Sequence, residues 1–243
     1  MTDTTSNTSD RVFANPEQHI VDFEFNDKVV AVFPDMIRRS VPGYEFVIAM
    51  TGLFANQQVG ENGKIYDLGC SLGATTLSIL QRLEARTYEV VAVDNSKAMI
   101  EKASRLCTDP RVRWLQQDIQ ATNIMGADFV AMNYTLQFIP VDERLALLTQ
   151  IRQGLTDGGA LIVSEKIELE DEAEQAFVNT THLNFKRANG YSDLEVSQKR
   201  TALENVMHPE ALTTHLTRLK AAGFSKCTIW YQCLNWASIV AFP

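Results

Sequence analysis

The residues best suited to chemistry begin in one short stretch, YDLGCSLGATT, residues 66–76. A short apolar run ends there in Gly69, and Gly73 follows at a spacing that fits a turn between a strand and a helix. Glycine permits the sharp backbone turn that brings the chain close to a bound ligand. The spacing differs from the GxGxxG of dinucleotide-binding enzymes, so it gives only weak support to a pyrophosphate ligand.

Two acidic residues extend this pattern, because each stands at the end of a further predicted strand. Asp94 ends VVAVDN, about 25 residues after Gly69, where a carboxylate can accept hydrogen bonds from both hydroxyls of a ribose. The next predicted strand ends in QQDI, which places Asp118 and Ile119 where they can contact the edge and face of an adenine. Ligands of open α/β sheets bind at the carboxyl ends of strands, and all three motifs fall there. The alternative is that both carboxylates only cap helices or face solvent.

A basic and aromatic segment, FKRANGYSDLEVSQKR at residues 185–200, forms the second group. It holds four cationic and two aromatic residues in an acidic chain, and EKIELEDEAEQ shortly upstream is mostly carboxylates. Glu195 and Lys199 are i, i+4 neighbours, a spacing typical of an ion pair on an exposed helix. Spacing alone therefore favours a solvated amphipathic helix that covers a pocket.

The elements that position these residues alternate between strand and helix from Tyr66 onward. Apolar β-branched runs predict buried strands, and apolar residues on one face predict helices. Strands are predicted in KIYDLGC, YEVVAVDN, VRWLQQDI, DFVAMNYTLQFI and ALIVSEKI, and helices in TTLSILQRLEA, SKAMIEKASRLC (with Ser96 as N-cap) and DERLALLTQIRQGL. The helix PEALTTHLTRLKAAGF and a hairpin of KCTIWYQCLN and WASIVAFP end the chain.

These elements predict an α/β fold of the Rossmann-like class: a mostly parallel seven-stranded sheet with an antiparallel C-terminal hairpin and helices on both faces. Residues 1–19, rich in Ser, Thr, Asn and Asp, are expected to be a flexible tail. Residues 20–243 are expected to form a single ligand-binding α/β domain with a helical insertion at about 168–207.

Composition narrows the function classes. The 243 residues carry a formal net charge of −8, which disfavours direct binding to nucleic acids or membrane surfaces but allows a local cationic pocket. The four cysteines form no CxxC pair, which indicates reduced thiols in the cytoplasm. The four histidines lack metal-ligand spacing, so no metal is expected. No apolar run has the length of a transmembrane helix.

The glycine turn and the two strand-end acids, without a phosphate motif, resemble class I S-adenosylmethionine-dependent methyltransferases. The resemblance covers most of the chain from Tyr66 to Pro243 and implies that S-adenosylmethionine (SAM) binds here. The fourth strand ends in MNYTLQFI, where Asn133 lacks the prolines of the Asp/Asn-Pro-Pro-aromatic run of amino-group methyltransferases. SAM binding is therefore better supported than methyl transfer.

An arginine near SAM needs an explanation, because the sulfonium of SAM is itself a cation. Arginine is suited to binding a carboxylate through two parallel hydrogen bonds. Arg187 or Arg200 near SAM would therefore indicate an acidic co-substrate or an acidic product.

Four phrases closely resemble one family, the carboxy-S-adenosyl-L-methionine synthases: VFPDMIRRSVPGY, YDLGCSLGATT, FKRANGYS and SQKR followed by LENVM. The likeness runs from about Phe23 to the last strand. It implies that SAM and prephenate are converted to carboxy-SAM and phenylpyruvate, and that a partner enzyme, a tRNA carboxymethyltransferase, uses the product on a wobble uridine of tRNA. It also implies a homodimer.

The resemblance further implies the roles of individual residues. Arg200 of SQKR would pair with the new carboxylate as the catalytic residue, and would also be first choice for holding prephenate, ahead of Lys186 and Arg187. It would act in its own subunit or across the dimer. The implied SAM contacts are Tyr44, Gly69, Cys70, Ser71, Asp94, Asn95, Asp118, Ile119, Asn133 and Arg200.

The implied chemistry accounts for the lack of a convincing general base. Prephenate releases carbon dioxide and hydroxide as it aromatises, the hydroxide removes a proton from the SAM methyl, and that carbon attacks the carbon dioxide. The protein then has mainly to orient the reactants and exclude water. Two alternatives stay open: a small-molecule SAM-dependent methyltransferase, and a SAM-binding subunit without catalysis.

Overall fold

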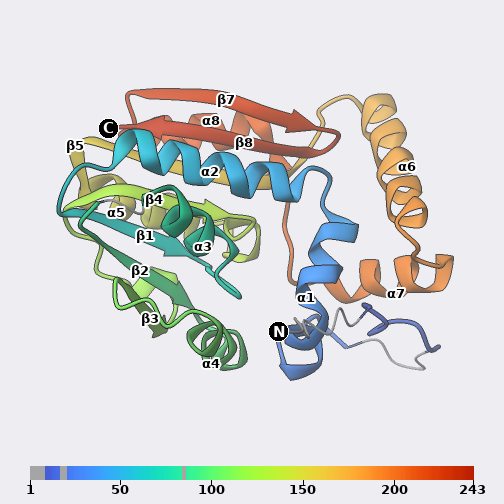
Figure 1. Ribbon diagram of the computed structural model, residues 1–243. Helices are drawn as coiled ribbons and strands as arrows, with labels where there is room; N and C mark the ends of the chain where they lie inside the picture. The colour runs from blue at the N-terminus through green and yellow to red at the C-terminus, as the bar shows by residue number, and fades with distance from the viewer. Residues whose placement is uncertain (1–8, 17–20, 84–85) are drawn as a thin grey trace.

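The computed structural model describes residues 9–16, 21–83 and 86–243 (Figure 1). Residues 1–8 and 17–19 of the predicted tail lie outside the described residues. Within the described ranges, no helix is long and apolar enough to cross a membrane.

A twisted sheet with strand order β3-β2-β1-β4-β5-β8-β7 forms the centre of the molecule. Neighbours from β3 to β5 pair in parallel, whereas β8 pairs antiparallel with both β5 and β7. The strands are β1 Gly63–Leu68, β2 Tyr88–Asp94, β3 Val112–Gln116, β4 Ala127–Asn133, β5 Leu155–Glu168, β7 Lys226–Cys233 and β8 Trp236–Phe242; the short β6 Glu210–Ala211 pairs with the end of β5. The predicted mostly parallel sheet with an antiparallel hairpin is confirmed.

The helices are α1 Asp27–Ser40, α2 Tyr44–Gln58, α3 Ala74–Arg82, α4 Lys97–Leu106, α5 Arg144–Gly154, α6 Glu172–Ala188, α7 Asp193–Glu204 and α8 Leu212–Ala221. Short 3₁₀ turns lie at Ile119–Ala121 and Leu136–Phe138. The predicted helices correspond to α3, α4, α5 and α8, and the Ser96 hydroxyl caps α4 by accepting from the Met99 amide at 3.2 Å. The sequence analysis did not predict α1 and α2.

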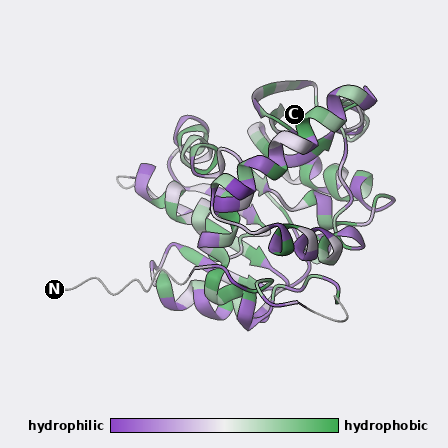
Figure 2. Cartoon of the chain, turned by 90° about the vertical axis from the view of Figure 1, so that its right-hand side faces the viewer, coloured by the Kyte–Doolittle hydropathy of each residue, from purple (hydrophilic) through white to green (hydrophobic). Residues whose placement is uncertain are grey.

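The two faces of the sheet bury separate hydrophobic cores. Successive side chains of a strand point to opposite faces, so Ile65 and Tyr66 of β1 enter different cores. Ile65 packs with residues of α2 and α3, including Ile79, and the core of Tyr66 includes Leu148 of α5 and Leu219 of α8. In Figure 2 the helices carry hydrophilic and hydrophobic residues side by side, as amphipathic helices on such a sheet do.

The fourth strand is shorter than predicted, and it ends at Asn133 rather than continuing through Ile139. Tyr134 has a positive φ of 60° and turns the chain out of the sheet. The next three amides donate to the buried Glu165 carboxylate on β5, with N–O distances of 3.3, 2.9 and 3.0 Å from Thr135, Leu136 and Gln137. Since these amides have a carboxylate partner, they form a loop instead of a strand.

Helices α6 and α7 lie with α1 at one end of the sheet, toward which the arrows of β1, β2 and β4 point in Figure 1. The His182 ring on α6 bonds the Ser40 carbonyl at the end of α1, at 2.8 Å. Gln198 on α7 donates to the carbonyls of Phe13 and Asn15 at 2.8 and 2.9 Å. The N-terminal residues 9–16 are thereby packed against α7.

The predicted ion pair between Glu195 and Lys199 is wrong. Glu195 occupies the third position of α7 and accepts from the amide and hydroxyl of Ser192, which completes a capping box. Lys199 is buried and donates instead to the Ser40 hydroxyl at 2.9 Å. Glu195 and Lys199 therefore do not pair with each other, because Glu195 binds the start of its own helix and Lys199 binds Ser40 on α1.

Candidate functional site

The glycine turn lies between β1 and α3, and its conformation requires glycine at two positions. Gly69 and Gly73 have positive φ angles of 75° and 81°. A Cβ on Gly69 would lie 2.1 Å from the Thr135 hydroxyl oxygen, and one on Gly73 would lie 2.5 Å from the Trp114 ring. Ser71 between them also has a positive φ, 50°. The turn is thus a tight, fixed feature that leaves its backbone open to one side.

Asp94, at the end of β2, holds the turn in place. Its carboxylate accepts from the Ser71 amide at 2.8 Å and from the Ser96 amide at 2.9 Å. Burial raises the pKa of Asp94, and these two hydrogen bonds oppose that shift. The Asp118 carboxylate accepts from the Asn95 amide at 3.1 Å, which joins the ends of β2 and β3. Asp94 therefore lines the cavity and also holds the backbone on both sides of it, whereas the cap of α4 is Ser96.

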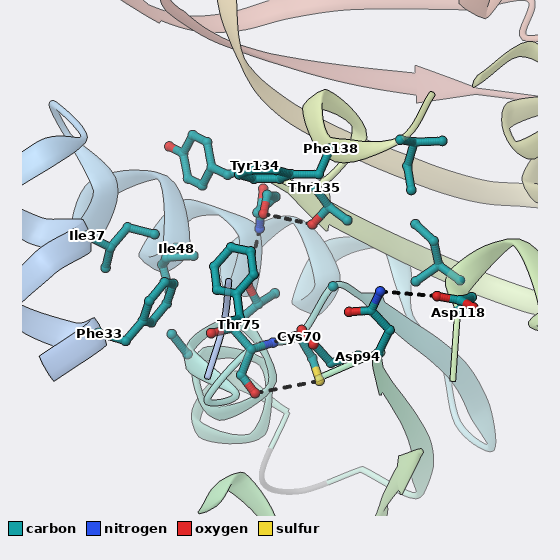
Figure 3. A pocket seen from close by; sticks show the side chains of 18 of the residues that line it. Phe33, Ile37, Ile48, Cys70, Thr75, Asp94, Asp118, Tyr134, Thr135 and Phe138 are labelled. Carbon is teal, nitrogen blue, oxygen red and sulfur yellow. Dashed lines mark hydrogen bonds between the residues drawn. The ribbon is translucent and has the colours of Figure 1, made fainter. Parts of the chain in front are cut away.

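Nine of the ten residues predicted to contact SAM line one cavity, drawn in Figure 3. They are Tyr44, Gly69, Cys70, Ser71, Asp94, Asn95, Asp118, Ile119 and Asn133. The figure places Asp94 and Asp118 on one side and the apolar Phe33, Ile37 and Ile48 on the other. A polar side with two carboxylates and an apolar side fit a nucleoside with an aliphatic sulfonium chain.

Asn133 is held by hydrogen bonds on both sides of its amide. Its Nδ2 donates to the Thr75 hydroxyl at 3.1 Å, and its Oδ1 accepts from the Ser164 hydroxyl at 2.7 Å. Ser164 in turn accepts from the Ser238 hydroxyl at 2.8 Å. The chain of bonds from β8 through β5 to β4 fixes the orientation of the amide at the edge of the cavity.

A second cavity shares the walls formed by Phe25, Phe33, Ile37, Tyr134 and Phe138 with the first. Its remaining surface is partly cationic, because Lys166, Lys186, Lys199 and His182 line it together with Trp236. Burial lowers the pKa of His182 to about 3, so this imidazole is neutral at pH 7. The positive charge of the second cavity therefore comes from its lysines.

Arg200 lies apart from the other nine predicted residues. It is exposed and lines a third cavity, which shares Lys166, Lys186 and His182 with the second. Arg187 lines none of the three cavities, since its guanidinium pairs with Asp193 at 2.6 Å and with Asn184 at 2.9 Å on the surface.

Several site residues escaped the sequence analysis. Lys166 follows the buried run of β5, so the strand-end rule that selected Asp94 would also have found it. Lys199 gave no such signal, because its partner Ser40 is 159 positions away in the sequence. The aromatic walls Phe25 and Phe33 come from the segment before β1, for which no structure was predicted. Within residues 9–16, 21–83 and 86–243, no three His, Cys, Asp or Glu side chains converge as metal ligands.

Comparisons with known proteins agree with this geometry. A family model described as a methyltransferase domain matches residues 65–159. The chain is 50% identical to the carboxy-S-adenosyl-L-methionine synthase of Pseudomonas putida strain W619, over 98% of this chain and 100% of that protein. It is 52% identical to the synthase of the same name from Geobacter sp. strain M21, over 96% of this chain and 98% of that protein.

Among solved structures, the fold is similar to human N-acetylserotonin methyltransferase in complex with SAM. The TM-score is 0.61 at 15% identity, covering 89% of this chain and 55% of that chain. PigF with SAH gives a TM-score of 0.62 at 19% identity, covering 90% of this chain and 60% of that chain. These likenesses concern the fold.

We expect Gly69→Ala to abolish measurable SAM binding. The new Cβ would overlap Thr135. Alanine would also have to keep the positive φ of this position, which costs a non-glycine residue roughly 1–2 kcal/mol before the overlap is counted. Isothermal titration calorimetry with SAM measures this loss. Gly60→Ala is the matched control, because nothing lies within 4 Å of its Cβ position; equal SAM affinity in both variants would contradict the role of the turn.

Glu165 predicts a pH effect on stability. Burial raises the pKa of Glu165 to about 8 in the folded protein, above the 4.5 of an exposed glutamate. Because the pKa of Glu165 is higher in the folded than in the unfolded state, protonated Glu165 favours folding. This stabilisation is fully present below the unfolded-state pKa and is lost as the pH rises through the folded-state pKa. Glu165→Gln should therefore lose less stability than the wild type between about pH 5 and pH 8, measured by urea unfolding.

The exposed Glu168 on the same strand supplies the control, and Glu168→Gln should follow the wild-type pH profile. Parallel profiles for wild type and Glu165→Gln would show that Glu165 does not titrate in this range.

Proposed function

The chain belongs to the carboxy-S-adenosyl-L-methionine synthase family, and on this premise we propose that it converts SAM and prephenate to carboxy-SAM and phenylpyruvate. The proposal is supported by close relatives over nearly the full length of the chain. The observation that carries it in the structure is the pairing of two adjoining cavities, one lined by the glycine turn and strand-end acids and the other by lysines and aromatic rings.

The first cavity is proposed to hold SAM. Asp94 would accept from the ribose hydroxyls, Asp118 and Ile119 would contact the adenine, and Asn133 would meet the amino-acid part near Tyr44. The second cavity is proposed to hold prephenate, because the sulfonium of SAM gives no reason for buried lysines beside it. An anionic co-substrate gives that reason.

The reaction joins carbon dioxide lost from prephenate to the methyl carbon of SAM. The hydroxide that leaves prephenate takes up the methyl proton and becomes water, so the reactants supply their own base. Phe33, Tyr134 and Phe138 lie between the two cavities and would hold the reacting groups together while excluding water. Carbon dioxide is then trapped at the methyl carbon before it escapes.

Arg200 is proposed to stabilise the new carboxylate. It is exposed and lines the third cavity, a position compatible with action in its own chain and with action across a homodimer. The homodimer, the use of the product by a tRNA carboxymethyltransferase, and the cytoplasmic location stay predictions.

Mass spectrometry of SAM after incubation with the protein tests the proposed reaction. We expect SAM to gain the mass of one carbon dioxide only when prephenate is added. Conversion of SAM to S-adenosylhomocysteine would instead indicate a methyltransferase, and unchanged SAM that nevertheless binds would indicate a non-catalytic subunit.

Arg200→Ala should lower carboxy-SAM formation by about tenfold or more, because a charge-assisted contact to the product carboxylate is lost. SAM affinity should change by less than about twofold, since the other proposed SAM contacts line a different cavity. Product formation and SAM calorimetry measure the two effects. Arg105→Ala, an exposed arginine on α4, is the control; equal losses of formation and SAM affinity in Arg200→Ala would refute the assigned role.

A further inference from the structure

Three lysines from three different elements converge on the second cavity. Lys166 lies near the end of β5, Lys186 in the last turn of α6, and Lys199 in the middle of α7. We call Lys166, Lys186 and Lys199 the lysine cluster. Lys166 and Lys186 also line the third cavity, beside the exposed Arg200. Two members of the cluster thus line both the second cavity and the cavity beside Arg200.

The charges of the cluster are only partly balanced by the protein. The Lys199 ammonium lies 3.7 Å from a carboxylate oxygen of Asp10, and it donates to Ser40 and to the Tyr191 hydroxyl at 2.9 and 3.4 Å. Among the residues that the structure describes, no carboxylate forms an ion pair with Lys166 or Lys186. The carboxylates that act on the cluster are Asp10, beside Lys199, and Glu168, whose charge opposes the lowering of the Lys166 pKa by burial.

These cations destabilise one another in the ligand-free cavity. Burial lowers the pKa of Lys186 to about 8, and the positive charges of Lys166 and Arg200 add to the shift. Burial lowers the pKa of Lys199 to about 7, although Asp10 opposes this. Unpaired buried charges are costly unless a partner of opposite sign arrives. A bound anion would supply that partner and restore the charged form of each lysine.

The other walls of the second cavity define the shape of that anion. Aromatic rings of Phe25, Phe33, Phe138 and Trp236 line it, and Phe25 packs edge-to-face on Phe138 at 5.5 Å between centroids. Rings on the walls favour an apolar ring in the ligand, and lysines that approach from three different elements favour carboxylates at more than one point of it.

We propose that the lysine cluster binds the two carboxylates of a ring-bearing dianion, with contacts from the buried Lys199 and from Lys166 and Lys186, which also line the third cavity. This inference rests on the proposed function, in which the dianion is prephenate. Under this proposal the three lysines select a dicarboxylate, whereas Arg187 is paired with Asp193 at the surface and does not.

Calorimetric titration of prephenate into protein saturated with S-adenosylhomocysteine tests the assignment without turnover, since S-adenosylhomocysteine has no methyl group to react. Lys186→Gln should weaken prephenate binding by about ten- to a hundredfold, the loss typical of one charge-assisted contact. Affinity for S-adenosylhomocysteine should stay unchanged. Arg187→Gln is the matched control, because Arg187 is the next residue on α6 but pairs with Asp193 at the surface.

Wild-type affinity for prephenate in Lys186→Gln would overturn the assignment, and so would a wild-type protein that does not bind prephenate. The mass-spectrometric assay tests the proposed reaction separately. If Lys186→Gln forms carboxy-SAM and binds prephenate as tightly as the wild type, the proposed reaction is supported but the role of the lysine cluster is refuted. Circular dichroism checks the fold of each variant. If Lys186→Gln does not fold, Lys166→Gln takes its place with the same expected loss.

Discussion

The buried carboxyl group of Glu165 is the constraint on which the site depends. It lies on β5 and accepts from the amides of Thr135, Leu136 and Gln137, so it ends β4 and shapes the loop that follows. That loop carries Tyr134 and Phe138, which stand between the two main cavities. Thr135 of the same loop donates to the Leu68 carbonyl at 3.1 Å, beside the glycine turn. One carboxyl group therefore couples the walls of both cavities to the sheet.

A buried arginine supports the same loop from the other side. Arg144 is completely buried; it donates to the Ile139 and Gln137 carbonyls at 2.9 and 3.2 Å and pairs with Glu210. Both buried groups are used to satisfy backbone atoms that have left the sheet. Such groups are costly to bury alone, and their full set of partners makes the loop conformation unique.

The charges that line the two cavities are opposite in sign to those of their proposed ligands. Asp94 and Asp118 line the cavity proposed for SAM, which carries its own positive charge. The adjoining second cavity is lined by lysines whose charges are only partly balanced by nearby carboxylates. A chain with a net charge of −8 thus keeps a cationic cavity inside an acidic surface. Such a cavity is suited to a small anion, whereas the net negative charge of the chain disfavours general binding of nucleic acids.

The sequence by itself determined the order of the elements, the sheet with its antiparallel hairpin, the family, and the polar side of the first cavity. These follow from local patterns, because a strand, its end and the turn after it are contiguous in the chain, and parallel strands bring their ends to one edge. Asp94 and Asp118 could be chosen in this way. Only the tertiary structure decided what the distant segments contribute: α1 supplies Phe33, Asp10 lies near Lys199, and Lys199 leaves its i, i+4 neighbour Glu195 for Ser40. The physical reason is that burial and hydrogen bonding between segments far apart in sequence outweigh the weak preference of neighbouring charges on one helix.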